Sequence, residues 1–134
     1  MSYYYIILIM RHLVLNGKML CIRSLSYDDI SFFFYNIMNL LSDKDQILFM
    51  DKSVKILNDT YNKYYVIYDE TNNIIIGTGK IHISNSGKIL KVCNIEHIII
   101  DKNQKDLKLK ELMLDYLKKV ALSEVGCIQC NVLV

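Results

Sequence analysis

The sequence predicts a single α/β domain of the mixed, α+β kind, with the element order β-α-α-β-β-β-α-β. The chain has 134 residues and is 52% hydrophobic, which suffices for one buried core. Short runs rich in isoleucine, valine and tyrosine alternate with turn residues, as strands do. A longer apolar run at 89–100 precedes a stretch at 107–122 whose apolar residues recur every three or four positions. Together these patterns predict a mixed sheet covered by helices.

The first half of the chain is expected to contain one strand and two helices. Residues 19–25 form the strand. Ser26 follows as a helix N-cap, and Asp29 three residues later completes a capping-box pattern. We therefore expect one helix at about 27–41 and a second at roughly 52–61.

The first 18 residues are expected to be an N-terminal extension of this domain, which spans 1–134. The apolar run at 3–10 is too short to cross a bilayer. It has no basic segment before it and no small-residue cleavage site after it, so a packed strand or helix is favoured over a signal peptide. The net charge is only +2 and the lysines are dispersed, so neither nucleic acid nor a membrane is an expected partner. We expect a cytoplasmic protein.

The second half is expected to be rich in strands. Turn residues separate the elements, and Gly126 is placed to end the connection after the helix. The expected elements are strands at 64–68, 74–83, 89–100 and 127–134, turns at 69–73 and 84–87, and a helix at 107–122.

Cys127 and Cys130 form a C-x-x-C pair, a spacing found in redox and zinc sites. Here the pair falls in a predicted strand, where residues three apart point to opposite faces. The chain has no second C-x-x-C. We therefore interpret both residues as buried thiols and expect no metal site.

Glu96 and His97 are the first candidates for chemistry. Both interrupt an apolar strand, and a carboxylate is costly to bury there without a partner or a function. A helix begins shortly afterwards, and its free N–H groups attract phosphate. The pattern indicates a ligand with a pyrophosphate beside a reacting group that needs a base. The alternatives are that Glu96 is an ion-paired structural residue, with Lys91 as partner, and that His97 is a core or interface histidine.

Five short motifs occur in order along residues 19 to 134. They are Ile22-Arg23-Ser24-Leu25 with Asp28-Asp29, Tyr64-Tyr65-Val66-Ile67, Ile76-Gly77-Thr78-Gly79, Ile95-Glu96-His97-Ile98 and Gly126-Cys127. In their order and spacing they resemble the GCN5-related N-acetyltransferase family, and within it the glucosamine 6-phosphate N-acetyltransferases.

The resemblance implies transfer of an acetyl group from acetyl-CoA to the amine of a sugar phosphate. It assigns catalysis to Glu96 and His97, with Glu96 as the base, and stabilisation of the oxyanion to strand N–H groups near Ile98. It also implies a homodimer, because family members place part of the acceptor site at a dimer interface. The implied substrate-binding residues are Glu96, His97, Ile98, Ile128 and Gln129. The implied cofactor-binding residues are Ile98, Ile99, Ile100, Lys105, Asp106, Leu107, Lys108, Leu109, Lys110 and Glu111.

The pyrophosphate loop departs from the family pattern. Asp106, Lys108 and Lys110 stand where the family has glycines, which let the backbone approach phosphate closely. The two lysines supply positive charge, whereas Asp106 repels phosphate. On base rates, Lys105, Lys108 and Lys110 are a solvated helix face. The fold is also expected to lack the family's last helix and strand.

Three functions remain open at this point. The chain is a hexosamine-phosphate acetyltransferase, an acetyltransferase for another amine such as a protein N-terminus or a polyamine, or a non-catalytic binding module on the same fold. A sugar-phosphate enzyme needs basic residues for the phosphate, and Lys80, Lys88 and Lys91 are the candidates.

Overall fold

The computed structural model describes residues 10–26, 28–29, 59–85, 90–104 and 108–133. The predicted helix at 27–41 lies outside these residues apart from its first turn. The predicted helix at 52–61 also lies outside them, except for 59–61, which are not helical.

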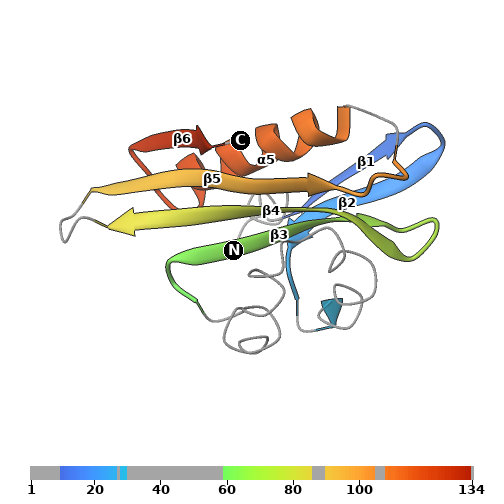
Figure 1. Ribbon diagram of the computed structural model, residues 1–134, viewed down its shortest axis with the longest axis horizontal. Helices are drawn as coiled ribbons and strands as arrows, with labels where there is room; N and C mark the ends of the chain where they lie inside the picture. Colours follow the sequence, from blue (N-terminus) through green and yellow to red (C-terminus); the bar gives the residue numbers. More distant parts are fainter. Residues whose placement is uncertain (1–9, 27, 30–58, 86–89, 105–107, 134) are drawn as a thin grey trace.

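Six strands form one sheet in the order β1-β2-β3-β4-β5-β6 (Figure 1). Neighbouring strands are antiparallel, except that β5 and β6 are parallel. Parallel neighbours need a crossover connection, which α5 supplies. The predicted mixed sheet is therefore confirmed. The elements are β1 Arg11–Leu15, β2 Lys18–Ser24, β3 Asn62–Asp69, β4 Ile74–Asn85, β5 Lys91–Ile100, α5 Lys108–Ser123 and β6 Gln129–Leu133.

Strand β1 was not predicted, because its residues were expected to belong to an extension. It forms a hairpin with β2 through Asn16 and Gly17, whose φ angles are 52° and 78°. Positive φ at both positions is the type I′ geometry, for which Asn-Gly is the preferred sequence. Leu13 and Leu15 pack against the core. The Asn-Gly pair is the feature of the sequence that indicates this hairpin.

Asp69 organises the turn between β3 and β4, which the sequence predicts correctly at 69–73. Its carboxylate is fully buried and accepts hydrogen bonds from the backbone N–H groups of Thr71 and Asn72 and from the Asn72 side chain. Asn73 then turns the chain with a φ of 56°. The turn carries Glu70, whose N–H bonds to the carbonyl oxygen of Met19 at 2.8 Å.

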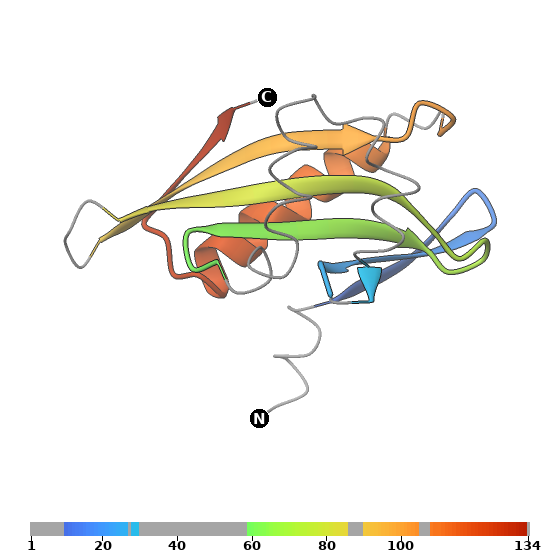
Figure 2. The ribbon, with the colours of Figure 1, turned by 60° about the horizontal axis from the view of Figure 1, so that its bottom comes forward.

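Helix α5 covers one face of the sheet, where it contacts β4, β5 and β6 (Figure 2). Its apolar stripe is buried as the sequence predicts, and Met113 and Leu117 are fully enclosed. Gly79 on β4 permits this close approach. A Cβ added at Gly79 lies 2.8 Å from Cδ1 of Leu117, closer than side chains tolerate. The chain leaves the helix through Gly126, which has a φ of +75°.

Strand β5 contains a β-bulge at His97. Glu96 pairs with Lys80 and Ile99 pairs with Thr78, so β5 has one more residue than β4 over this interval. His97 has a φ of 53°, which is uncommon for a residue other than glycine. The bulge shifts the alternation of side chains, and Ile98 therefore packs against the same core as Ile95. Two strand residues three apart ordinarily face opposite sides.

The predicted capping interaction after β2 is present. The backbone N–H of Ser26 donates to the Asp29 carboxylate at 2.7 Å. Arg23 donates to the other carboxylate oxygen at 2.8 Å. Burial raises the pKa of Asp29, but the hydrogen bonds from Arg23 and Ser26 outweigh it, so the pKa lies below its ordinary value.

The cysteine interpretation is partly wrong. Cys127 precedes β6, so the strand rule that separates it from Cys130 does not apply, and both residues pack in or against the same core. Cys127 is not a free thiol, because a disulfide joins it to Cys93, with Cα atoms 6.0 Å apart. Cys130 is free and half-buried. In the described part of the chain, no helix has the length and apolarity needed to span a membrane.

Candidate active site

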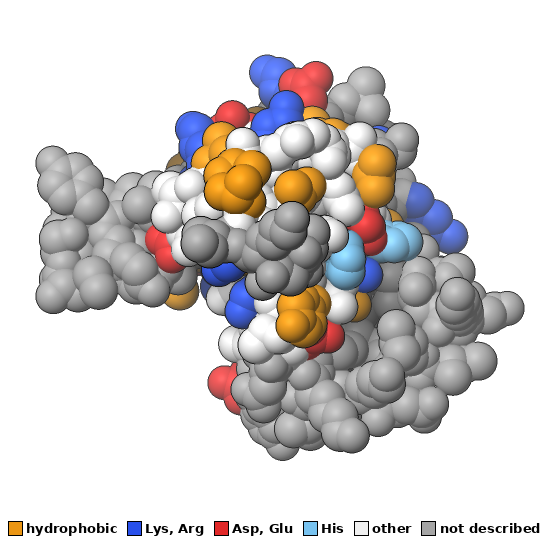
Figure 3. Space-filling model, turned by 90° about the vertical axis from the view of Figure 1, so that its left-hand side faces the viewer, with side chains coloured by type: hydrophobic (Ala, Val, Ile, Leu, Met, Phe, Trp, Pro, Cys, Tyr) orange, Lys and Arg blue, Asp and Glu red, His pale blue; other side chains and the backbone are white. Residues whose placement is uncertain are grey.

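Glu96 lies on the sheet face opposite α5 and forms the centre of the candidate site. Its carboxylate is 3.7 Å from Nζ of Lys80 and 3.7 Å from Nε2 of His97. The Glu96 side chain is 21% exposed, so it is shielded yet open to a ligand. Figure 3 shows histidine side chains beside acidic and basic ones at the surface. The structure therefore brings together the two residues predicted to be catalytic and adds Lys80.

The alternative ion pair with Lys91 is wrong. Lys91 has the same strand parity as Cys93 and Ile95, whose side chains pack toward α5, and it borders a pocket with Glu124 on that face. Of the three lysines proposed to bind phosphate, Lys80 is beside Glu96 and Lys91 is on the other face. Lys88 lies outside the described residues.

Polar side chains extend across the same face on either side of Glu96. The His82 ring is 2.9 Å from the amide oxygen of Asn62. On the far side, Asn131 of β6 donates to Asn94 of β5 at 3.1 Å. This row of amides and an imidazole offers donors and acceptors to a hydrogen-bonding ligand, and the sequence alone did not suggest it.

Strand β5 continues beyond its described pairing with β6. Among the described residues, β6 pairs with β5 from Val92 as far as Glu96, where Leu133 is the partner. The predicted cofactor-binding residues Ile98, Ile99 and Ile100 follow that last described pair, on the part of β5 that leads to α5.

The N-terminus of α5 follows β5 after a short loop. Among the predicted cofactor-binding residues here, Lys108, Lys110 and Glu111 are exposed, whereas Leu109 is 2% exposed and belongs to the core. Lys105, Asp106 and Leu107 lie outside the described residues. The exposed end of the helix and its lysines fit a pyrophosphate, which both the helix dipole and ammonium groups attract.

Ile128 and Gln129, the other predicted substrate-binding residues, lie at the far end of β6. Gln129 pairs with Val92, four residues before Glu96, which is roughly 13 Å away at about 3.3 Å per residue. Ile128 donates its N–H to the carbonyl oxygen of Lys91. The structure therefore does not place either residue next to Glu96 within one chain.

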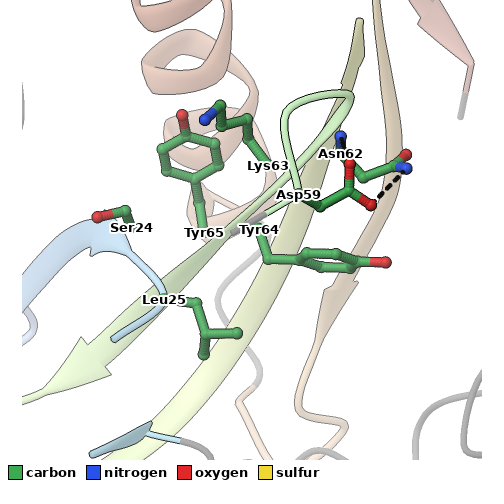
Figure 4. A pocket seen from close by; sticks show the side chains of 7 residues that line it. All are labelled: Ser24, Leu25, Asp59, Asn62, Lys63, Tyr64 and Tyr65. Atoms are coloured by element: carbon green, nitrogen blue, oxygen red, sulfur yellow. Dashed lines mark hydrogen bonds between the residues drawn. The ribbon is translucent and has the colours of Figure 1, made fainter. Parts of the chain in front are cut away.

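A pocket of about 200 Å³ adjoins the site along β3. Tyr64 and Tyr65 both line the pocket and project from opposite faces of β3. Asp59 and Asn62 lie on the Tyr64 side (Figure 4). Nζ of Lys80 lies 5.8 Å from the centre of the Tyr64 ring, so Lys80 connects the pocket to Glu96.

Two of the ionisable groups that line this pocket, Asp59 and Tyr65, have shifted pKa values. Burial raises the pKa of Asp59, but hydrogen bonds from Tyr61 and Asn62 outweigh it, and the pKa is lowered overall. Burial raises the pKa of Tyr65 to about 12, so its hydroxyl stays protonated at neutral pH.

Comparisons with known proteins agree with this architecture. An acetyltransferase from Trypanosoma brucei has a similar structure, with 18% identity, a TM-score of 0.64, and coverage of 86% of this chain and 82% of that one. A glucosamine-6-phosphate N-acetyltransferase from Arabidopsis thaliana has 18% identity and a TM-score of 0.66, with the same coverage. An aminoglycoside N-acetyltransferase in complex with CoA has 13% identity and a TM-score of 0.70, covering 91% and 81%. The chain therefore has the GCN5-related N-acetyltransferase fold.

The acetyltransferase fold is shown by structure and not by sequence. No protein-family model matches the chain. No curated protein matches it either. The expected fold class is confirmed, and Glu96, the bulge at His97 and the start of α5 lie along one continuous segment of it.

Proposed function

We propose that this chain transfers an acetyl group from acetyl-CoA to a primary amine, with Glu96 as the base. The observation that carries the proposal is the position of Glu96, which lies on the sheet face opposite α5, 3.7 Å from Lys80 and next to the bulge at His97. A carboxylate there lies beside the reacting end of a pantetheine bound along Ile98–Ile100. The exposed start of α5 then faces the pyrophosphate.

The chemistry requires a base, because an ammonium group cannot attack a thioester. Glu96 accepts the proton from the amine, directly or through a water molecule. The amine nitrogen forms a bond to the thioester carbonyl carbon, the carbon–sulfur bond breaks, and the proton passes to the departing thiolate. His97 and Ile98 lie opposite Gly79 in the bulge, so their N–H groups are the nearest candidates to stabilise the oxyanion.

The acceptor that we propose is a phosphorylated amino sugar, with glucosamine 6-phosphate as the first compound to test. Lys80 supplies a cation beside Glu96, and its side chain is only 18% exposed. The amides of Asn62 and Asn94 and the His82 ring offer hydrogen bonds to hydroxyl groups. Two of the similar structures act on amino sugars according to their names, the glucosamine-6-phosphate and aminoglycoside enzymes.

We also propose a homodimer. Among the described strands, β6 is at one edge of the sheet. Three apolar side chains are exposed there: Ile128, just before the strand, at 59%, and Val132 and Leu133, within it, at 37% and 55%. An edge strand with exposed apolar side chains favours pairing with a second chain. Light scattering of the purified protein tests this, and a monomer mass at working concentration contradicts it.

Calorimetry with CoA is the first experiment, followed by thiol release with glucosamine 6-phosphate, glucosamine, a polyamine and an N-terminal peptide. We expect CoA binding and fastest turnover with the sugar phosphate. If the polyamine or the peptide turns over faster, the proposed acetyltransferase activity stands and the proposed acceptor is wrong. A folded protein that does not bind CoA is a non-catalytic module, and the proposal fails.

A further inference from the structure

A second cluster of chemically active side chains lies three strands from Glu96, at the β1–β2 end of the sheet. His12 on β1, Cys21 on β2 and Glu70 after β3 each direct one potential ligand atom to the same point. These atoms all lie within 4.8 Å of one another. We propose that this cluster is a zinc site with three protein ligands, independent of acetyl transfer.

The sheet fixes the three residues in place. His12 and Cys21 are direct partners in the β1–β2 register, so their side chains share a face. Cys21 is in turn paired with Tyr68 of β3. Glu70 is anchored by its backbone hydrogen bond to Met19. Two of the ligands therefore lie on adjacent strands, and the third directly follows β3 and is held by a backbone hydrogen bond.

The distances are close to those of a zinc site. Nδ1 of His12 lies 3.1 Å from Oε1 of Glu70, and Nε2 lies 4.0 Å from Sγ of Cys21. Bond lengths of about 2.3 Å to sulfur and 2.0–2.1 Å to nitrogen place tetrahedral ligand atoms roughly 3.5 Å apart. A metal binds only one ring nitrogen of His12, so the imidazole has to rotate until that nitrogen faces both Cys21 and Glu70. The ligand atoms then have to approach one another from within 4.8 Å to the tetrahedral spacing.

The ligand types favour zinc over the common alternatives. A thiolate and an imidazole select borderline metals such as zinc, whereas magnesium and calcium prefer oxygen ligands only. One carboxylate completes a three-ligand set and leaves the fourth tetrahedral position to water. Arg23, two residues from Cys21, is paired with the Asp29 carboxylate through two hydrogen bonds, so it opposes a bound metal only weakly.

The burial pattern gives the metal both a protected ligand and a path of entry. Cys21 is 3% exposed, whereas the His12 side chain is 65% exposed and that of Glu70 is 31% exposed. Sγ of Cys21 lies 4.0 Å from Nε2 of His12, so the buried ligand and the exposed one are already adjacent. Zinc binds the deprotonated thiolate, so its binding releases a proton.

Titration of the 134-residue protein with cobalt, with the Cys93–Cys127 disulfide intact, tests the site, because cobalt bound to a thiolate gives a strong charge-transfer absorption. We expect one cobalt per chain, with the absorption lost in Cys21→Ser and retained in the matched control Cys130→Ser. In a competition with a chelator, Glu70→Gln and His12→Gln should each weaken zinc binding by at least roughly tenfold. CoA binding should be unchanged in all four variants.

Cobalt that binds without the absorption, or an absorption that persists in Cys21→Ser, overturns the proposal. If circular dichroism shows that Cys21→Ser does not fold, the zinc affinity of His12→Gln tests the site instead. The His12 side chain is largely exposed, so this variant should fold. Unchanged zinc affinity in that variant also overturns the proposal, and the cluster is then only a thiol–imidazole–carboxylate chain of hydrogen bonds. Loss of CoA binding in the parent chain affects the acetyltransferase proposal and leaves this one intact.

Discussion

The ammonium group of Lys80 lies 3.7 Å from the carboxylate of Glu96, and the two residues are direct partners across β4 and β5. The pairing accounts for a carboxylate on a largely apolar strand. It also gives the site two groups of opposite charge, and each leads to a separate prediction for the proposed acetyl transfer.

The first prediction concerns Glu96 as the base. Glu96→Gln keeps the shape of the side chain and removes its basicity, so turnover should fall by roughly 100- to 10,000-fold. CoA affinity should change little, because the carboxylate is not at the pyrophosphate. The comparison uses thiol release for turnover and calorimetry for binding. Glu124→Gln, on the α5 face, is the matched control and should remain active. Full turnover in Glu96→Gln would show that Glu96 is a structural residue and not the base.

The second prediction concerns Lys80 as the phosphate ligand. Lys80→Met should raise KM for glucosamine 6-phosphate by roughly 10–100-fold, the range expected for a lost charged hydrogen bond. KM for unphosphorylated glucosamine should stay nearly constant. Lys91→Met, on the opposite face, should affect neither substrate. Equal increases for both sugars in Lys80→Met would show that the lysine acts through Glu96 and not on the phosphate.

The third prediction concerns the backbone at His97. With a φ of 53°, this position suits glycine better than any β-branched residue. His97→Gly should therefore leave stability unchanged or raise it by up to about 1 kcal/mol, whereas His97→Val should lower it by at least about 1 kcal/mol. Thermal unfolding measures both. A valine variant as stable as the parent is incompatible with the bulge.

Much of the fold was predictable from the sequence, and the reasons differ by element. Alternation in β3 and β4 and the spacing of apolar residues in α5 are local signals, and the elements formed where expected. The bulge at His97 was not predictable, because Ile98, Ile99 and Ile100 are all apolar and a shift by one residue leaves the pattern unchanged. In a run of identical apolar residues, either register places an isoleucine in the core, so the sequence does not indicate which register forms.

The candidate site was only half predictable. Glu96 stands out as a carboxylate in an apolar strand, but its partner depends on strand register, and the partner suggested from the sequence was Lys91, whereas the structure has Lys80. The cluster of His12, Cys21 and Glu70 has no sequence signature, because β1 itself was missed and its three members belong to separate segments.

The fourth prediction concerns the contact between Gly79 and α5. Gly79→Ala places a methyl group 2.8 Å from Cδ1 of Leu117, so it should destabilise the protein by roughly 1–3 kcal/mol. Leu117→Ala alone should cost about 2–5 kcal/mol. The double variant should lose less than the sum, because the added methyl enters the space that Leu117 vacates. Strictly additive losses in urea unfolding would show that the two positions do not touch.

The fifth prediction concerns the acid stability provided by Asp29. Its pKa is lowered in the folded state, so its contribution is complete above the unfolded value of about 3.9 and is lost as the pH falls through the lower folded value. Asp29→Asn should cost about 1–3 kcal/mol at pH 7, and the difference from the parent should shrink below about pH 4. Asp115→Asn, in an exposed ion pair, should cost under about 1 kcal/mol. A pH-independent cost for Asp29→Asn contradicts the prediction.

The parallel pairing of β5 and β6 has a consequence for how the protein is assembled. Antiparallel hairpins join β1 to β2 and β3 to β4 through short turns, so their contacts are local in the chain. Strand β6 instead pairs with β5 across the intervening helix α5, so this pairing joins residues far apart in the sequence. We therefore expect the β5–β6 pairing beside Glu96 to form later in folding than the hairpins, because closing a longer loop costs more conformational entropy.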